Sequence, residues 1–167
     1  MLIGEDDKIS IKHLTLNESQ FILDAFNESS FIENVGDKNI RSIREAEEYL
    51  LEGPIASYQN NGFGMNVIFL KSSNKPIGLC GLVKRETFEH PDIGYALLPE
   101  FWGQGIARSA SKIVLEYASS DLGLKKILAF TSPHNEKSAK LLEKLGFGFV
   151  KQIALYREKD YLYEINL

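Results

Sequence analysis

Two glycines follow an apolar stretch and a proline within residues 92–108, DIGYALLPEFWGQGIAR, and this order suits anion binding. Gly103 and Gly105 have no Cβ, so an anion can approach the backbone closely there. They stand directly before a stretch with helical periodicity. The first turn of a helix leaves N–H groups without partners at the positive end of the helix dipole. We therefore expect a pyrophosphate at this turn.

Three kinds of nucleotide site use a glycine turn, and the residues present distinguish among them. The P-loop pattern Gly-x4-Gly-Lys-Ser/Thr is absent, so ATP or GTP hydrolysis has no support. The dinucleotide pattern requires a small residue where Arg108 stands, because helix and strand pack closely there. Asp121 is near the spacing of a ribose-binding acid, yet it precedes its strand instead of ending one.

The composition limits the partners of the chain. Its 167 residues, 44% of them hydrophobic, suit a single domain over residues 1–167 with one continuous core. The formal net charge of −4 and the interleaved charges indicate neither a nucleic-acid nor a membrane partner. Residues 1–10 lack the apolar core of a signal peptide and no window reaches membrane-span length, so we expect a cytoplasmic protein. The scattered histidines and the lone Cys80 predict no metal site and no disulfide.

Four segments with helical periodicity are expected to position these residues. Capping-box patterns, Asn17-x-x-Gln20 and Ser42-x-x-Glu45, precede the first two helices. The expected helices cover residues from about 18 to 27, from 43 to a break near Gly53 and Pro54, from 106 to a stop at Gly123, and from about 135 to 145 with Gly146 as the stop.

Alternation and apolar runs predict strands over residues 9–14, 65–71, 76–86, 92–98, 125–131, 147–155 and 161–167. The unit over residues 92–131 implies a right-handed crossover between parallel strands, while the hairpins at both ends imply antiparallel neighbours. The fold class is therefore α/β, with a mixed, mainly antiparallel sheet flanked by helices. Ligands of such sheets lie where neighbouring strands diverge, beside helix N-termini.

Taken together, these motifs resemble one family. Asp-Ile-Gly-Tyr-x-Leu-x-Pro-x-x-Trp-Gly-x-Gly-x-Ala, followed by Asn135-x-x-Ser138 and Leu145-Gly-Phe147, resembles the GNAT superfamily of acetyl-CoA-dependent N-acetyltransferases, with most likeness to its RimJ/RimL-type branch. The resemblance spans residues from about 9 to 167. It implies a sheet splayed between the strands at 92–98 and 125–131, with acetyl-CoA as cosubstrate in the opening.

The resemblance also implies a cofactor site built from two segments. Residues 102–108 match the turn whose backbone N–H groups hold the CoA pyrophosphate, and Leu97 and Leu98 match a bulged strand end that pairs with pantetheine. Asn135 matches a side chain that hydrogen-bonds pantetheine; alternatively it is a plain N-cap, and Trp102 alternatively packs on the helix. The implied cofactor-binding residues are Leu97, Leu98, Trp102, Gly103, Gln104, Gly105, Ile106, Ala107, Arg108, Asn135 and Ser138.

Two catalytic residues follow from the same resemblance. Ser138 matches a hydroxyl near the CoA sulfur, which stabilises or protonates the leaving thiolate. Asp92 occupies the position of the glutamate base of histone-type members, one methylene shorter, and its alternative is a solvated carboxylate at the start of a strand. The RimL-like branch has a further carboxylate in its penultimate strand, where this chain offers Leu155. Other candidate bases are Glu86, Glu89, His90, Glu158 and solvent.

The expected activity is transfer of an acetyl group from acetyl-CoA to a primary amine by direct attack in a ternary complex. An α-amine with a pKa near 8 needs a weaker base than a lysine side chain near 10.4, which makes a protein N-terminus a candidate acceptor. Two alternatives stay open: a non-catalytic acyl-CoA sensor, and an enzyme acting on a small amine such as an aminoglycoside or polyamine. The sequence does not decide between a monomer and a homodimer.

Overall fold

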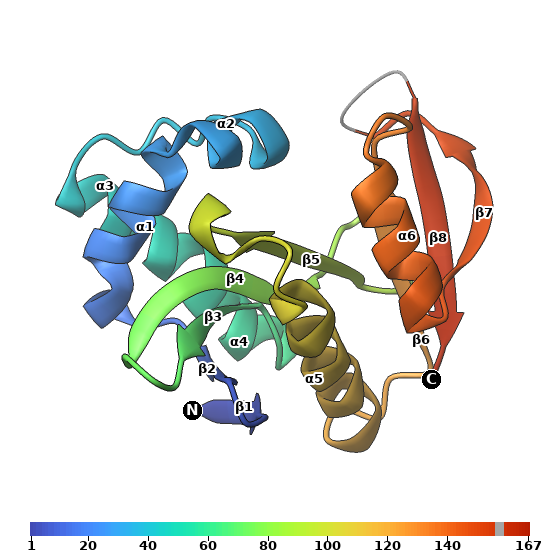
Figure 1. Cartoon of the computed structure of the whole chain (residues 1–167), viewed down its shortest axis with the longest axis horizontal. Coiled ribbons are helices and arrows are strands. Elements are labelled where there is room, and N and C mark those ends of the chain that lie inside the picture. Colours follow the sequence, from blue (N-terminus) through green and yellow to red (C-terminus); the bar gives the residue numbers. More distant parts are fainter. Residues whose placement is uncertain (156–158) are drawn as a thin grey trace.

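The structure is a computed structural model that describes residues 1–155 and 159–167. Its centre is a sheet whose eight strands, within these described ranges, follow the order β1-β2-β3-β4-β5-β6-β8-β7. The strands are β1 (Leu2–Glu5), β2 (Ile9–His13), β3 (Met65–Leu70), β4 (Lys75–Val83), β5 (Asp92–Leu97), β6 (Lys126–Thr131), β7 (Gly148–Ile153) and β8 (Asp160–Asn166). The expected α/β class with a mixed, mainly antiparallel sheet is confirmed (Figure 1).

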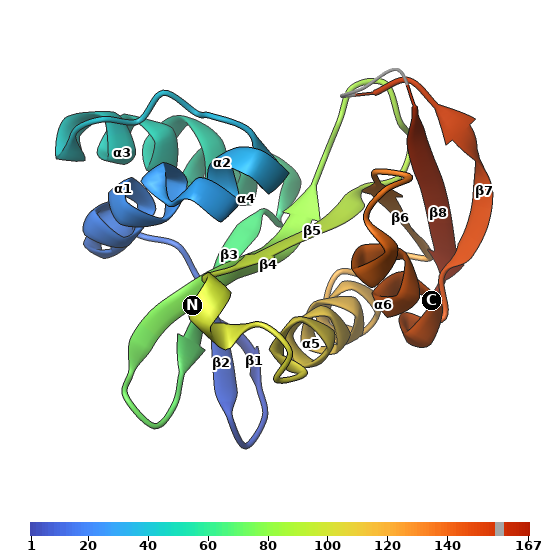
Figure 2. The same ribbon diagram turned by 45° about the horizontal axis from the view of Figure 1, so that its top comes forward.

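The sheet is divided at the junction of β5 and β6. The other neighbouring strands pair antiparallel, whereas β5 and β6 are parallel and share one residue pair, Asp92 with Leu128. Beside that pair, the Leu128 N–H donates to the Pro91 carbonyl at 2.9 Å. From this point the two strands diverge, as Figures 1 and 2 show. The expected splay between the strands at 92–98 and 125–131 is therefore confirmed.

Helices cover both faces of the sheet. They are η1 (Leu16–Glu18), α1 (Ser19–Asn27), α2 (Ser29–Val35), α3 (Ile43–Leu50), η2 (Leu51–Ile55), α4 (Ala56–Asn61), η3 (Pro99–Phe101), α5 (Ile106–Ser120) and α6 (Glu136–Leu145). Helices α1 to α4 lie on one face of β3 to β5, and α5 lies on the opposite face (Figure 2). One apolar cluster forms under α1 and α3, and a second lies between the sheet and α5. None of the helices in the described residues has the length and apolar composition that a membrane crossing requires.

The structure corrects the expected N-terminal helices in three respects. The capping box of the first helix is formed by Thr15 and Glu18 instead of Asn17 and Gln20. The second helix does not break near Pro54, because a turn of π-helix, η2, carries the chain through to α4. A proline lacks an N–H and its ring clashes with the carbonyl four residues earlier, which disfavours a regular α-helix, and Pro54 lies within the π turn instead. Helix α2 was not predicted at all.

The first strand, β1, was also not predicted, and it helps to position α5. A Cβ on Gly4 would lie 2.5 Å from Cγ2 of Ile113, so only glycine permits the close approach of β1 to this helix. In the turn after β1, the Asp6 carboxylate accepts a hydrogen bond from the Ser109 hydroxyl, one turn into α5. The start of α5 is thus tied to the N-terminal hairpin.

Candidate functional site

The glycine turn between β5 and α5 has the geometry of an anion site. Gly103 and Gly105 adopt left-handed φ values of 71° and 76°, and a Cβ on either would meet nothing within 4 Å. Gly105 is the N-cap of α5 and offers no side-chain cap, and the first turn contains no acidic residue. The N–H groups of that turn therefore have no side-chain cap and lie at the positive end of a 15-residue helix.

Trp102 stabilises the turn from strand to helix. Its indole Nε1 donates to the Leu97 carbonyl at 2.9 Å, and the residue is 48% exposed. Neighbouring residues of a strand point their backbone groups to opposite edges. The Leu98 N–H donates to the Ile77 carbonyl of β4 at 3.0 Å, so the backbone groups of Leu98 point towards β4. Those of Leu97 therefore point to the other edge of β5, which faces the opening between β5 and β6.

The expected bulge at the end of β5 is wrong. The register of β4 with β5 runs without a shift from Val83–Asp92 to Gly78–Leu97. The Leu98 carbonyl accepts from the Phe101 N–H at 3.0 Å, so both backbone groups of Leu98 have partners within the chain. Of the two leucines, Leu97 is the one whose backbone faces the opening.

Helix α6 brings Asn135 and Ser138 to the other side of the opening. Asn135 is the N-cap of α6, and its Oδ1 accepts the Ser138 N–H at 3.1 Å, so the capping role is present. The cap uses only the carbonyl oxygen and leaves the amide nitrogen as a separate donor. The Ser138 Oγ lies 2.7 Å from the hydroxyl of Tyr95 on β5. A side chain of β5 and a side chain of α6 therefore meet across the junction.

Tyr95 was missed as a site residue, although it stands in the motif around the glycine turn. Tyr95 is two residues from Ile93 and two from Leu97 along β5, so all three side chains lie on the α5 face of the sheet. Burial raises the pKa of Tyr95 to about 12, so its hydroxyl stays protonated at neutral pH. The two-residue spacing could have predicted the face on which Tyr95 lies, but nothing in the sequence indicated that Ser138 would contact it.

Asp92 is buried and ion-paired, so the interpretation as a solvated carboxylate is wrong. It is 5% exposed and accepts from Arg85 Nε at 2.7 Å and Nη2 at 3.1 Å. Burial raises the pKa of Asp92, and the Arg85 guanidinium opposes that shift. Arg85 also lies over the Phe130 ring of β6, 5.7 Å from its centroid, so the ion pair spans the β5–β6 junction.

The other candidate bases lie in or near two loops. Glu86 and Glu89 are exposed and His90 is half-buried, all in the loop from β4 to β5, and His90 Nε2 lies 4.0 Å from Glu89 Oε2. Glu158 lies outside the described residues, and Leu155 lies in a bend after β7.

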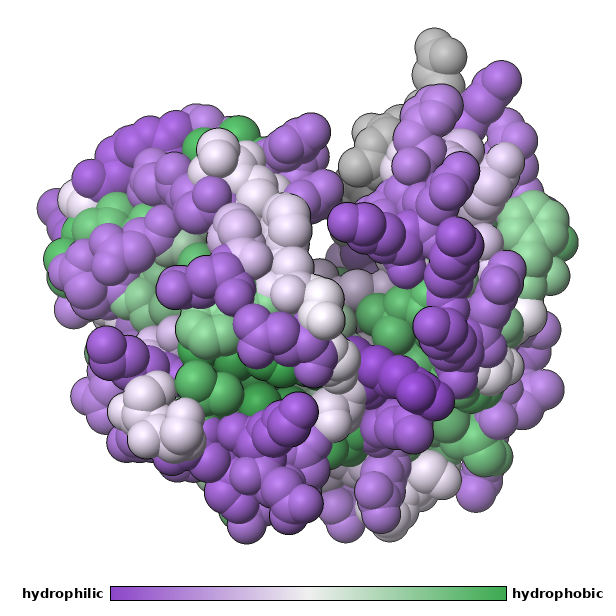
Figure 3. All heavy atoms as spheres, viewed as in Figure 1, coloured by the Kyte–Doolittle hydropathy of each residue, from purple (hydrophilic) through white to green (hydrophobic). Residues whose placement is uncertain are grey.

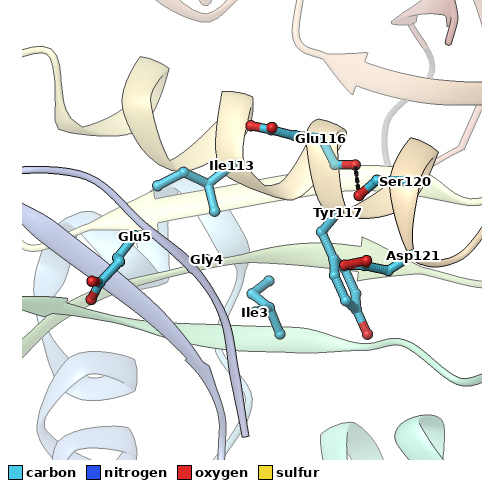
Figure 4. A pocket seen from close by; sticks show the side chains of 8 residues that line it. All are labelled: Ile3, Gly4, Glu5, Ile113, Glu116, Tyr117, Ser120 and Asp121. Carbon is cyan, nitrogen blue, oxygen red and sulfur yellow. Dashed lines mark hydrogen bonds between the residues drawn. The ribbon is translucent and has the colours of Figure 1, made fainter.

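Two surface depressions lie away from the glycine turn. One is formed by β1 and the C-terminal half of α5, where Ser120 Oγ donates to the Glu116 carbonyl at 2.8 Å (Figure 4). The glycine turn is at the opposite end of this helix, about 20 Å away at 1.5 Å per residue. The second is a groove between α1, the β3–β4 turn and Leu98. The surface is also hollowed between the α1–α4 side and the α6 side, above the β5–β6 junction (Figure 3).

Comparison with known proteins finds a family that the chain matches. Residues 11–148 match the family model described as the acetyltransferase (GNAT) domain. The uncharacterized N-acetyltransferase YoaA of Bacillus subtilis (strain 168) is 29% identical over 146 residues, which are 87% of this chain and 82% of that protein. In other curated relatives the match covers a smaller share of the relative's own length, 32% in one case.

Solved structures share the fold over nearly the whole chain. The ribosomal-protein-S5-alanine acetyltransferase from Vibrio fischeri superposes with a TM-score of 0.86 at 23% identity, covering 99% of this chain and 96% of that one. RimL, a ribosomal L7/L12 alpha-N-protein acetyltransferase in complex with coenzyme A, superposes with a TM-score of 0.88 at 14% identity, covering 100% and 98%. Identities this low establish the fold alone.

Proposed function

Since this chain belongs to the GNAT acetyltransferase family, we propose that its β5–β6 opening is the site at which an acetyl group passes from acetyl-CoA to a primary amine. The observation that carries this proposal is the N-terminus of α5, which has no side-chain cap and where Gly103 and Gly105 leave open space beside the diverging strands. A pyrophosphate requires such donors and a positive dipole end.

The cosubstrate is proposed to lie along the edge of β5. Its pyrophosphate binds the backbone of residues 103–108 with the side chain of Arg108, which is exposed. Its pantetheine arm runs past the Leu97 backbone and the Asn135 amide towards Ser138. Leu98 is left out of this contact set because both its N–H and its carbonyl bond within the chain, whereas the Trp102 indole engages only the carbonyl of Leu97.

The transfer step then needs a neutral amine and an assisted leaving group. The nitrogen lone pair attacks the thioester carbonyl carbon, the C–N bond forms, and the C–S bond breaks with its electron pair going to sulfur. The Ser138 hydroxyl donates a hydrogen bond to the developing thiolate. The proton lost by the amine nitrogen passes to a base.

We assign that base role to Asp92, acting through a water molecule, since the Arg85 bonds use one lone pair of each carboxylate oxygen and leave the other for a water. A carboxylate with a raised pKa is better matched to an amine with a pKa near 8 than an ordinary one. Asp92, Gly94 and Ala96 alternate onto the face of β5 that α1 to α4 cover, opposite Tyr95. The amine is proposed to enter from that face.

Among acceptors, a protein N-terminal α-amine is the one we favour. Two of the structural neighbours are named as acetyltransferases of ribosomal proteins, one of them of an α-amine. Acidic side chains around the N-terminal helices could suit a cationic drug, but three of them are engaged in the fold: Glu28 caps α2, Asp37 pairs with Arg41 at 2.6 Å, and Glu45 accepts the Arg41 N–H. They therefore give little support to an aminoglycoside pocket.

Thiol release from acetyl-CoA tests the proposal. The protein is incubated with acetyl-CoA and, separately, with ribosomal N-terminal peptides, spermidine and an aminoglycoside. Amine-dependent release with the peptides is expected. Release with only spermidine or the aminoglycoside would identify a small-amine enzyme, and tight CoA binding without release for any amine would favour the sensor alternative.

A further inference from the structure

The hydroxyls of Tyr95 and Ser138 form a polar contact between β5 and α6, which belong to different halves of the sheet. Tyr95 is largely buried among the apolar side chains under α5, so its ring has little freedom to move. It lies opposite Cys80 in the β4–β5 register, and Cys80 is completely buried. The Tyr95 hydroxyl is thus delivered to α6 by a rigid strand.

The 2.7 Å contact can have either hydroxyl as the donor. Each hydroxyl carries one hydrogen, so the donor in the pair cannot give the same hydrogen to a third group. If Tyr95 donates, the Ser138 hydrogen remains available to a ligand in the opening. If Ser138 donates to Tyr95, only the oxygen lone pairs of Ser138 face the ligand, and these repel a developing thiolate.

We propose that Tyr95 is a positioning residue that donates its hydroxyl hydrogen to Ser138 Oγ and so directs the Ser138 hydrogen at the sulfur of the cosubstrate. This inference rests on the function proposed above. Hydrogen bonds in a chain polarise one another, so a donor to Ser138 Oγ also makes Ser138 a better donor. No proton leaves Tyr95 in this arrangement, which agrees with a hydroxyl that burial keeps protonated at neutral pH.

The test is a double-mutant cycle of Tyr95→Phe and Ser138→Ala, read out as kcat and KM for acetyl-CoA. Tyr95→Phe keeps the ring and removes only the hydroxyl, so kcat should fall about fivefold, the effect of one neutral hydrogen bond, with KM unchanged. In the Ser138→Ala background the same substitution should have no further effect, because Tyr95 acts through Ser138. Tyr163→Phe is the matched control, since Tyr163 is a buried tyrosine of β8 packed in the same apolar cluster; its kcat should be that of the parent.

Three results would overturn the inference. A Tyr95→Phe variant with the parent kcat would make Tyr95 a packing residue only. An equal loss in both backgrounds would mean that Tyr95 acts independently of Ser138. A parent protein that binds CoA but releases no thiol would contradict the proposed function itself, a result distinct from the other two.

Discussion

Ser138 is fixed at both its backbone and its side chain. Its N–H donates to Asn135 Oδ1 and its Oγ contacts Tyr95, so its position depends on the helix cap and on β5 together. Such a hydroxyl can stabilise a charge that appears only as the C–S bond breaks, and interactions of that kind affect turnover more than binding.

Replacing Ser138 with alanine should therefore lower kcat about a hundredfold with little change in the KM for acetyl-CoA. Steady-state kinetics with the preferred amine measures both. Ser119→Ala, an exposed serine of α5, is the control and should behave as the parent. A Ser138→Ala enzyme with full kcat would remove Ser138 from the mechanism.

Asp92→Asn tests the base at the same scale. Asparagine keeps an oxygen for Arg85 but cannot accept a proton, so kcat should fall by about a hundredfold at pH 7, within the range of general base catalysis. The loss should shrink as the pH rises past the α-amine pKa near 8, because the neutral amine then forms without help. The pH profile of kcat measures this, and a loss that is the same at every pH would shift the role to Glu86, Glu89, His90 or solvent.

The sequence indicated some of these residues and not others. Gly103, Gly105, Asn135 and Ser138 belong to local motifs, and their turn and cap geometry is local too. Arg85 and Tyr95 matter because of partners far along the chain, and a spacing argument has no access to such contacts. The buried state of Asp92 was missed for the same reason.

At the scale of elements, the β5–β6 junction depends on a small set of contacts. In the described part of the chain these strands share one residue pair, Asp92 with Leu128, and the Arg85–Asp92 ion pair and the Arg85–Phe130 contact lie beside it. Removing one partner of a buried ion pair leaves an uncompensated charge and typically destabilises a protein by about 3–5 kcal/mol.

Arg85→Leu should accordingly destabilise the fold by about 3 kcal/mol at pH 7. With the guanidinium gone, the main influence that opposes burial is lost and the pKa of Asp92 rises further. A carboxyl whose pKa is higher in the folded state than in the unfolded state contributes stability at a pH below its unfolded-state pKa. That contribution is lost as the pH rises through its folded-state pKa. The deficit of Arg85→Leu should thus be larger at pH 7 than at pH 4, as measured by urea unfolding.

The control for this variant is Arg44→Leu, which breaks an exposed pair with Glu48. Exposed pairs contribute little, so Arg44→Leu should unfold like the parent at both pH values. Hydrogen exchange of the Leu128 amide, which bonds to Pro91 across the junction, should accelerate only in Arg85→Leu. Equal stability of Arg85→Leu and parent would show that the ion pair does not hold the junction.

Elements with strong periodicity or clear end signals were predicted, and elements without them were not. Helix α6 has its N-cap at Asn135 and its left-handed stop at Gly146, as expected, and the hairpin of β3 with β4 formed as expected. The elements β1, α2 and α4 were not predicted, and they are four, seven and six residues long. Segments this short are stabilised by tertiary packing, which local patterns do not reveal.

At the scale of the whole molecule, the two halves of the sheet divide the proposed work. The half with β1 to β5 supplies the glycine turn, Leu97 and Asp92, and the half with β6 to β8 supplies α6 with Asn135 and Ser138. The crossover through α5 connects the halves and carries the anion site at its start. A site of this kind requires the full fold, since neither half contains all of its groups.

CoA binding to two glycine variants tests the central claim most directly. Gly105→Glu places a carboxylate where the pyrophosphate is proposed to bind, while Gly123→Glu adds the same charge beyond the other end of α5, also at a left-handed φ (64°) and also with no atom within 4 Å of its Cβ. The backbone strain is therefore matched, and thermal unfolding of the two variants should be alike. Calorimetric titration should show that Gly123→Glu binds CoA as the parent does and that Gly105→Glu binds at least about tenfold more weakly, because like charges in contact cost several kcal/mol. Parent-like CoA affinity in Gly105→Glu would contradict the account.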